Sequence, residues 1–196
     1  MKNLIGVVQM NSSNQPADNV AFAKAQIVQA ADQGLDLVSF PETFVYAVEK
    51  HSEKHHAAQT LDGELVQTFR DLASQYDISV LLGSIYEKTP DEDKRLYNTS
   101  ILIDRQGELN GVYRKIHMCD APTLGYNESV GIKPGNIPVV ADHEIGKLGL
   151  TICYDLRFPE LFRFLTEKGA EVIFVPALFS LYREAPLVAT FDCTCH

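Results

Sequence analysis

A cysteine stands at the junction between an apolar strand and a helix in the second half of the chain. The predicted strand Lys147–Ile152 runs directly into Cys153, and Pro159 opens the helix that follows. In an α/β domain such a turn exposes a side chain at the carboxyl end of the sheet, where ligand sites lie. The backbone N–H groups around Tyr154 face outward there and could bind an oxyanion beside a thiolate. The alternative is that Cys153 is a small apolar residue that caps a buried strand.

A glutamate and a lysine occupy positions from which they could assist this thiol. Glu42 directly follows the predicted strand Leu35–Phe40 and Pro41, and a carboxylate in apolar surroundings can act as a general base near neutral pH. Strand alternation places Arg114 and Lys115 on opposite faces, so one of them points inward. A buried ammonium group can stabilise a tetrahedral oxyanion. The alternatives are a solvated loop glutamate and a pair of charges that protects a sheet edge from aggregation.

Apolar runs alternate with helical stretches along the chain, a pattern that favours an α/β domain. The predicted helices are Pro16–Gln33, Gly63–Tyr76 and Pro159–Lys168. The predicted strands are Leu4–Met10, Leu35–Phe40, Ile78–Ser84, Lys147–Ile152 and Glu171–Val175, with a hairpin that joins Tyr97–Asp104 to Gly111–Met118. Residues 119–138 are expected to form a long loop of the kind that often carries function.

The composition is that of one globular domain and argues against several classes of partner. The chain has 196 residues, of which 45% are hydrophobic, enough for a sizeable core. Its 17 basic and 26 acidic residues give a formal net charge of -9, which repels nucleic acid and anionic membranes. No apolar run approaches the roughly 20 residues that span a bilayer, and the first residues are typical of a strand rather than a signal peptide. We therefore expect a soluble, cytoplasmic protein with reduced thiols.

Four segments, taken in order, resemble the nitrilase superfamily of carbon-nitrogen hydrolases, which use a triad of Glu, Lys and Cys. These segments are Phe40–Glu42, Tyr113–His117, Asn127–Ser129 with Pro134–Gly135, and Cys153–Leu161. The resemblance covers residues 1 to about 180, and four ordered matches are far more specific than any one of them. The second and fourth segments look most like the omega-amidase and deaminated glutathione amidase branch, whose substrates are small amides that bear a carboxylate.

The resemblance implies a fold and a mechanism. The fold is a four-layer αββα sandwich, incomplete at the C-terminus. Glu42 would deprotonate Cys153, which attacks the amide carbon, and Lys115 and the Tyr154 backbone amide would bind the oxyanion. Ammonia would leave, and the resulting thioester would be hydrolysed by a water that Glu42 activates. Glu128 matches the family's second glutamate, which lies near the lysine and helps to place the substrate.

The same resemblance implies a homodimer or larger assembly and no metal or organic cofactor. The alternative function is a catalytically inactive remnant or an interaction protein that keeps the triad. Three histidines, His51, His55 and His56, could place two imidazoles one helical turn apart, as in a metal site. Because the stretch is highly polar, a solvated lid loop is the expected structure there.

The resemblance stops near residue 182, so residues 1–182 are expected to form about the N-terminal two thirds of a hydrolase domain. Residues 183–196 do not match the family, which continues at this point with a segment containing His-Trp. The possible codons for residues 182–196, when read one nucleotide later, can encode almost all of the family's segment. We therefore interpret residues 183–196 as a frameshifted tail, in which Cys193 and Cys195 form no metal or redox motif. The alternative is a genuinely divergent C-terminus.

The nucleotide sequence across codons 182–196 tests this interpretation. We expect the shifted reading frame to encode His-Trp and the residues around it, because loss of two nucleotides near codon 182 would produce the observed tail. Sequencing of this region from independently prepared DNA provides the measurement. Codons that cannot encode His-Trp in the shifted frame would contradict the interpretation.

Overall fold

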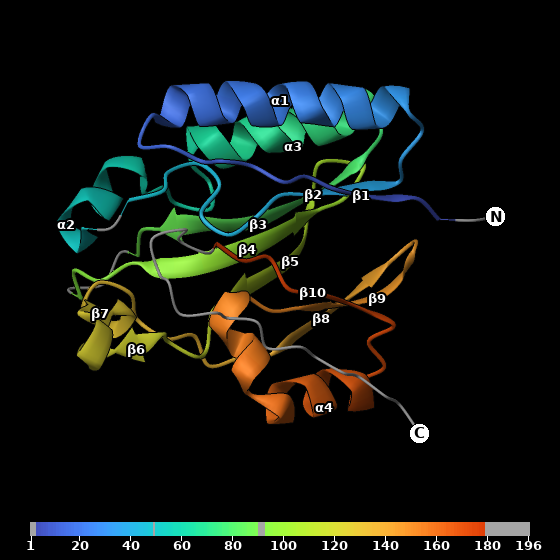
Figure 1. Cartoon of the computed structure of the whole chain (residues 1–196). Helices are drawn as coiled ribbons and strands as arrows, with labels where there is room; N and C mark the ends of the chain where they lie inside the picture. Colours follow the sequence, from blue (N-terminus) through green and yellow to red (C-terminus); the bar gives the residue numbers. More distant parts are fainter. Residues whose placement is uncertain (1–2, 49, 90–92, 179–196) are drawn as a thin grey trace.

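A five-stranded sheet with the order β1-β2-β3-β4-β5 forms the centre of the computed structural model (Figure 1). The structure describes residues 3–48, 50–89 and 93–178. The strands are Ile5–Val7 (β1), Leu37–Ser39 (β2), Ser79–Glu87 (β3), Tyr97–Ile103 (β4) and Leu109–Arg114 (β5). The first three strands are parallel, and β4 and β5 join them as an antiparallel hairpin.

Two helices, α1 (Pro16–Asp32) and α3 (Glu64–Tyr76), lie side by side over one face of this sheet (Figure 1). Pro16 suits the first turn of α1 because its fixed φ is already helical. Buried residues recur at three- and four-residue intervals in both helices, as Ala23, Ile27 and Ala30 show in α1. Each helix therefore presents one apolar stripe to the sheet.

A second sheet covers the opposite face of the first. It has the order β10-β9-β8, formed by Val172–Phe174 (β10), Gly146–Leu150 (β9) and Val139–His143 (β8). The helix α4 (Pro159–Glu167) packs on its outer side, where Leu165 contacts Gly149 of β9 (Figure 1). The resulting order of helices, sheet, sheet and helix confirms the predicted four-layer α/β fold.

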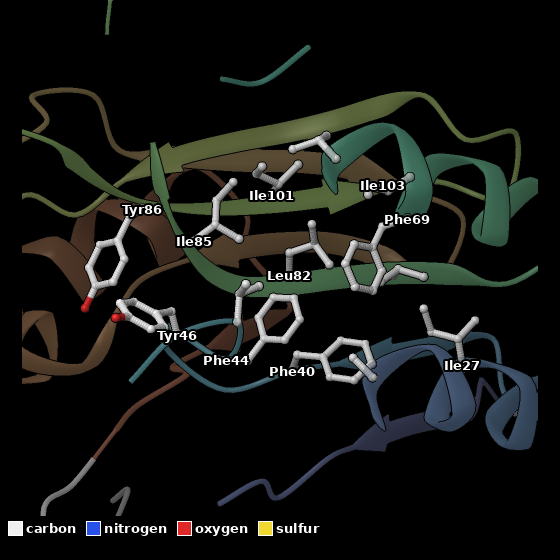
Figure 2. Close-up of a cluster of buried hydrophobic side chains, with 14 of the residues drawn as sticks. Ile27, Phe40, Phe44, Tyr46, Phe69, Leu82, Ile85, Tyr86, Ile101 and Ile103 are labelled. Carbon is white, nitrogen blue, oxygen red and sulfur yellow. The ribbon is translucent and has the colours of Figure 1, made fainter. Parts of the chain in front are cut away.

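Burial on both faces of the five-stranded sheet explains its apolar sequences. Val80 and Leu82 of β3 join a cluster between the sheet and the helices α1 and α3, here called the outer cluster. Leu81 points the other way, into an inner cluster between the two sheets. Figure 2 shows the outer cluster, in which the rings of Phe40, Phe44 and Phe69 meet. Because successive side chains of a strand point to opposite faces of the sheet, the same strands contribute to both clusters.

Every predicted helix and strand occurs in the structure, but some bounds differ: the strand predicted at Gly111–Met118 is Leu109–Arg114, and the strand predicted at Leu4–Met10 is Ile5–Val7. Three regions differ in more than their bounds. Strand β8 was not predicted, and it pairs with β9 across a turn at Gly146, whose φ is 124°. The predicted loop 119–138 contains two short strands, β6 (Asp120–Ala121) and β7 (Tyr126–Asn127), and two 3-10 turns, η2 (Pro122–Leu124) and η3 (Glu128–Val130). The expected lid loop is instead helical, as α2 (His51–Lys54) and η1 (His55–Ala57).

Some predictions concern parts of the chain that the structure does not describe. The frameshifted tail, with Cys193 and Cys195, lies outside the described residues. Within the described residues, no helix combines the length and the apolar character that crossing a bilayer requires.

Removal of the Phe69 ring should destabilise the fold strongly. Phe69 is fully buried, and its ring centroid lies 5.6 Å from that of Phe44. We expect Phe69→Ala to lower the free energy of unfolding by about 3–5 kcal/mol, because it leaves a cavity. Phe22→Ala is the matched control, since Phe22 lies on the neighbouring helix α1 with 45% of its surface exposed. That change should cost no more than about 0.5 kcal/mol in urea unfolding; equal losses in the two variants would contradict the packing described.

Candidate active site

Lys115 forms the centre of a buried group of charges. It directly follows β5, and only 2% of its surface is exposed. Its Nζ lies 3.2 Å from Oε1 of Glu42 and 2.9 Å from each carboxylate oxygen of Glu128. Arg114 faces the other way and forms an ion pair with Glu87. Of the two cations that alternation separated, Lys115 is therefore the one that points inward.

A bulge in β3 holds the loop that carries Glu42. The pairing of β3 with β4 shifts between Leu82 and Ile85, which frees Gly83 and Ser84 from the ladder. Ser84 accepts a hydrogen bond of 2.8 Å from the backbone N–H of Thr43, the residue after Glu42. A Cβ atom at Gly83 would overlap the carbonyl oxygen of Phe40. The lack of a side chain at position 83 lets the loop lie directly on the sheet.

Two further donors hold the Glu42 carboxylate, and neither was predicted from the sequence. The side-chain amide of Asn98, in β4, donates to Oε1 at 2.9 Å. The backbone N–H of Leu178 donates to Oε2 at 2.9 Å. Glu42 itself is buried, with 6% of its surface exposed. Its orientation is thus fixed from the sheet and from the segment that follows β10.

Cys153 lies on a strained turn at the end of β9. Its φ is 45°, a backbone conformation that residues other than glycine rarely adopt and that often occurs at functional positions. Its backbone N–H donates to the carbonyl of Pro176, and the N–H of Ile152 donates to a carboxylate oxygen of Asp155. The turn continues as the 3-10 helix η4 (Cys153–Arg157). These contacts stabilise the backbone that presents the thiol.

Asp155 connects the cysteine turn to the segment around Lys115. It is completely buried and accepts hydrogen bonds from the Tyr113 hydroxyl at 2.7 Å and from His117 Nδ1 at 2.7 Å. The backbone N–H of His117 donates to the same carboxylate at 3.1 Å. Burial, together with the charge of Asp155, raises the pKa of Tyr113, so its hydroxyl stays a donor. The sequence signal for this contact was only an Asp two residues after the cysteine.

The electrostatics of the site keep the lysine charged and the thiol neutral. Burial raises the pKa of Cys153, and the negative charge of Glu42 raises it further, against a smaller opposing effect of Lys115. Burial alone would lower the pKa of Lys115, but the charges of Glu42 and Glu128 outweigh it and raise that pKa. A base therefore has to remove the thiol proton before the sulfur can attack.

The structure brings four of the five predicted site residues together through these contacts: Glu42, Lys115, Glu128 and Cys153. Tyr154 lies beside this group because it follows Cys153, and its ring packs edge-on against Phe158. A second buried cation, Lys54 of α2, was not predicted. Burial lowers the pKa of Lys54, while the nearby charges of Glu128 and Glu42 oppose that shift.

Among the described side chains, the histidine stretch around His55 and His56 does not form a metal site. His55 and His56 are exposed to solvent. In the part of the chain that the structure describes, no three His, Cys, Asp or Glu side chains form a group that could hold a metal ion.

Known proteins are similar to this chain in sequence and in fold. A family model described as carbon-nitrogen hydrolase matches residues 4–188. The deaminated glutathione amidases of Yersinia enterocolitica and Dictyostelium discoideum are 40% identical over 185 residues and 39% identical over 184 residues, respectively. These matches cover 92% and 89% of this chain but only 64% and 63% of the relatives, so the chain spans slightly less than two thirds of their length.

A solved structure supports the same assignment. The crystal structure of the C. elegans NitFhit protein matches with a TM-score of 0.81 at 33% identity, over 92% of this chain and 46% of that chain. The family match spans both the Glu42 loop and the Cys153 turn, and it agrees with the four layers of the fold. The chain therefore belongs to the carbon-nitrogen hydrolase family.

Proposed function

We propose that this chain acts as an amidase that hydrolyses the C–N bond of a small amide through a thioester on Cys153. The observation that carries the proposal is that the partly exposed thiol of Cys153 lies beside the buried carboxylate of Glu42 and the buried ammonium of Lys115. Burial raises the pKa of the Cys153 thiol, and Glu42 lies close enough for its charge to raise that pKa further, so Glu42 can accept the proton. The ammonium of Lys115, 3.2 Å from the same carboxylate, supplies a fixed positive charge for an oxyanion.

The first half of the reaction forms the thioester. Glu42 takes the proton of Cys153 while the sulfur attacks the amide carbon, and the carbonyl oxygen becomes an oxyanion. Lys115 and the backbone N–H of Tyr154 stabilise that oxyanion. As the tetrahedral intermediate collapses, the C–N bond breaks and Glu42 returns its proton to the leaving nitrogen, which departs as ammonia.

The second half hydrolyses the thioester. Glu42, again a carboxylate, takes a proton from a water molecule whose oxygen attacks the thioester carbon. The C–S bond then breaks, the acid leaves, and the proton on Glu42 returns to the sulfur of Cys153. The charges of Glu42 and Lys115 are the same at the end of the cycle as at the start.

Glu128 holds Lys115 in place during both halves. Its two oxygens each lie 2.9 Å from Nζ, and Oε2 also accepts the backbone N–H of Cys119 at 2.7 Å. A carboxylate held in this way fixes the position of the ammonium. We propose that Glu128 also contributes to placing the substrate.

The proposed substrate is a small amide that bears a carboxylate. Two of the relatives described above are named deaminated glutathione amidase. The buried cation Lys54, close enough to Glu42 and Glu128 to feel both charges, supports a negatively charged substrate. The alternative of a catalytically inactive remnant finds less support, because Glu42, Lys115 and Glu128 are buried in mutual contact beside the partly exposed Cys153. The homodimer or larger assembly stays a prediction, which sedimentation of the purified chain tests.

Cys153→Ala should abolish the release of ammonia from amides, because it removes the sulfur on which the proposed thioester forms. We expect at least about a thousandfold loss, as for removal of a nucleophile elsewhere, with an unchanged melting profile. Cys119→Ser is the matched control, since it alters a thiol but keeps the backbone N–H that contacts Glu128. Ammonia release measured with a coupled assay provides the test. Full activity in Cys153→Ala would refute the thioester mechanism.

A pair of matched amides tests the proposed substrate class. We expect a four- or five-carbon amide with a terminal carboxylate to be hydrolysed with a higher kcat/KM than the amide of equal length that ends in a methyl group. A difference of about tenfold or more is expected from one charge-assisted contact. Equal kcat/KM values for the two amides would contradict this substrate class but not the amidase chemistry.

A further inference from the structure

We infer that Asn98 is a positioning residue for Glu42: its side-chain amide fixes the carboxylate so that Oε2, rather than Oε1, receives the proton of Cys153. The inference rests on the proposed function in one respect, namely that Glu42 is the base for this thiol. Asn98 lies in β4, the strand between β3 and β5, and 2% of its surface is exposed.

The hydrogen bonds of Glu42 divide unequally between its two oxygens. Oε1 accepts from Asn98 Nδ2 at 2.9 Å and from Lys115 Nζ at 3.2 Å. Each carboxylate oxygen offers about two lone-pair sites, so these two donors occupy Oε1. Oε2 accepts the backbone N–H of Leu178 at 2.9 Å. One site on Oε2 is left for the thiol of Cys153, whose pKa is raised by burial and by the charge of Glu42.

The chemistry of the pair fixes the orientation of the Asn98 amide. An ionised carboxylate only accepts hydrogen bonds, so the NH2 group has to face Glu42. The Asn98 side-chain oxygen Oδ1 then points elsewhere, and it is buried without a hydrogen-bond partner among the described residues. An unpaired buried carbonyl destabilises a fold. Asn98 therefore costs stability at one end of its amide while it holds the base at the other, as residues at functional sites often do.

The position of Asn98 in the sheet also links Glu42 to Lys115. The backbone carbonyl of Asn98 accepts the backbone N–H of Lys115 at 2.9 Å, while its side-chain amide donates to Glu42. One residue on a central strand thus sets the positions of both charged groups. Sites supported by strands are held more accurately than sites supported by loops alone.

The test compares Asn98→Ala and Asn98→Asp with the wild-type chain and with Ser100→Ala. Ser100 lies two residues along the same strand and is buried, and its hydroxyl group has no hydrogen-bond partner in the part of the chain that the structure describes. The first readout is the rate at which iodoacetamide alkylates Cys153, followed by the mass of the peptide that contains it. This readout needs no turnover. The second readout is kcat and KM on an amide substrate, with melting temperature as the measure of stability.

We expect Asn98→Ala to slow alkylation of Cys153 and to lower kcat by about tenfold to a hundredfold, because the base is no longer held toward the thiol. KM should change less than about twofold, since the Asn98 amide oxygen is inaccessible to a substrate. The melting temperature should fall, because Glu42 loses a buried donor and a cavity is left, so the rates are measured well below it. Ser100→Ala should match the wild type in all three measurements.

Asn98→Asp keeps the size of the side chain and gives a signature that depends on pH. The introduced carboxyl group faces Glu42 and neighbours Lys115, in a site that also contains Glu128, Lys54 and the Cys153 thiol. When protonated it can donate to Oε1 as the amide does; when ionised it repels Glu42. The ratio of the variant rate to the wild-type rate should therefore rise as the pH falls from 8 to 5.

Several results would overturn the inference. These are wild-type alkylation in Asn98→Ala, a higher KM at unchanged kcat, equal losses in Ser100→Ala, or a ratio for Asn98→Asp that does not vary with pH. The two proposals fail separately. If no amide is hydrolysed but alkylation slows as described, the proposed function fails and the role of Asn98 stands. If Asn98→Ala does not fold, the isosteric Asn98→Asp and its pH signature decide.

Discussion

The structure depends on one buried ammonium group that two carboxylates share. Desolvation of Lys115, Glu42 and Glu128 is costly, and it is offset only if the three charges stay in contact. Loss of one partner from such a group typically costs about 3–5 kcal/mol. Because the three residues come from the end of β5, the loop after β2 and the turn η3, this constraint holds together segments that are far apart in the sequence. The hydrophobic layers around it supply the burial that makes the constraint strong.

A third carboxylate, that of Asp155, connects the Lys115 segment to the turn that carries Cys153. Asp155 accepts hydrogen bonds from Tyr113 and His117, which stand two residues before and two residues after Lys115. It also caps the backbone that leads into Cys153 through the N–H of Ile152. The ammonium and the thiol are therefore placed relative to each other by a side chain whose described hydrogen bonds go to neither of them. This arrangement separates the groups proposed to react from the group that sets their geometry.

Much of the fold and part of the site could be predicted from the sequence because their signals are local. Strands buried on both faces give continuous apolar runs, and helices give their own periodicity. Glu42, Lys115, Glu128 and Cys153 stand in recognisable motifs. Strand β8 escaped prediction because its apolar part is only Val139, Val140 and Ala141, too short to distinguish from a loop.

A different reason explains why the sequence did not predict the contacts of Asn98, Asp155 and Leu178. Asn98 reads as an ordinary polar residue at the start of a strand, and its partner Glu42 is 56 residues away. Leu178 acts through its backbone N–H, at a distance of 136 residues from Glu42, so its side chain carries no signal of the contact. Contacts of this kind depend on the packed layers, which no short segment encodes.

The bulge in β3 has a consequence for how such a site is recognised. At Gly83 the backbone of Phe40 and the ring of Pro176 both approach the sheet so closely that a single added carbon would collide with them. Phe40 leads into the Glu42 loop, and the Pro176 carbonyl accepts the N–H of Cys153. Gly83 carries no chemistry, yet related sequences should preserve it as strictly as a reacting residue. A search for catalytic groups by invariance alone would therefore select Gly83, because the space left by an absent side chain is as specific a requirement as a thiol.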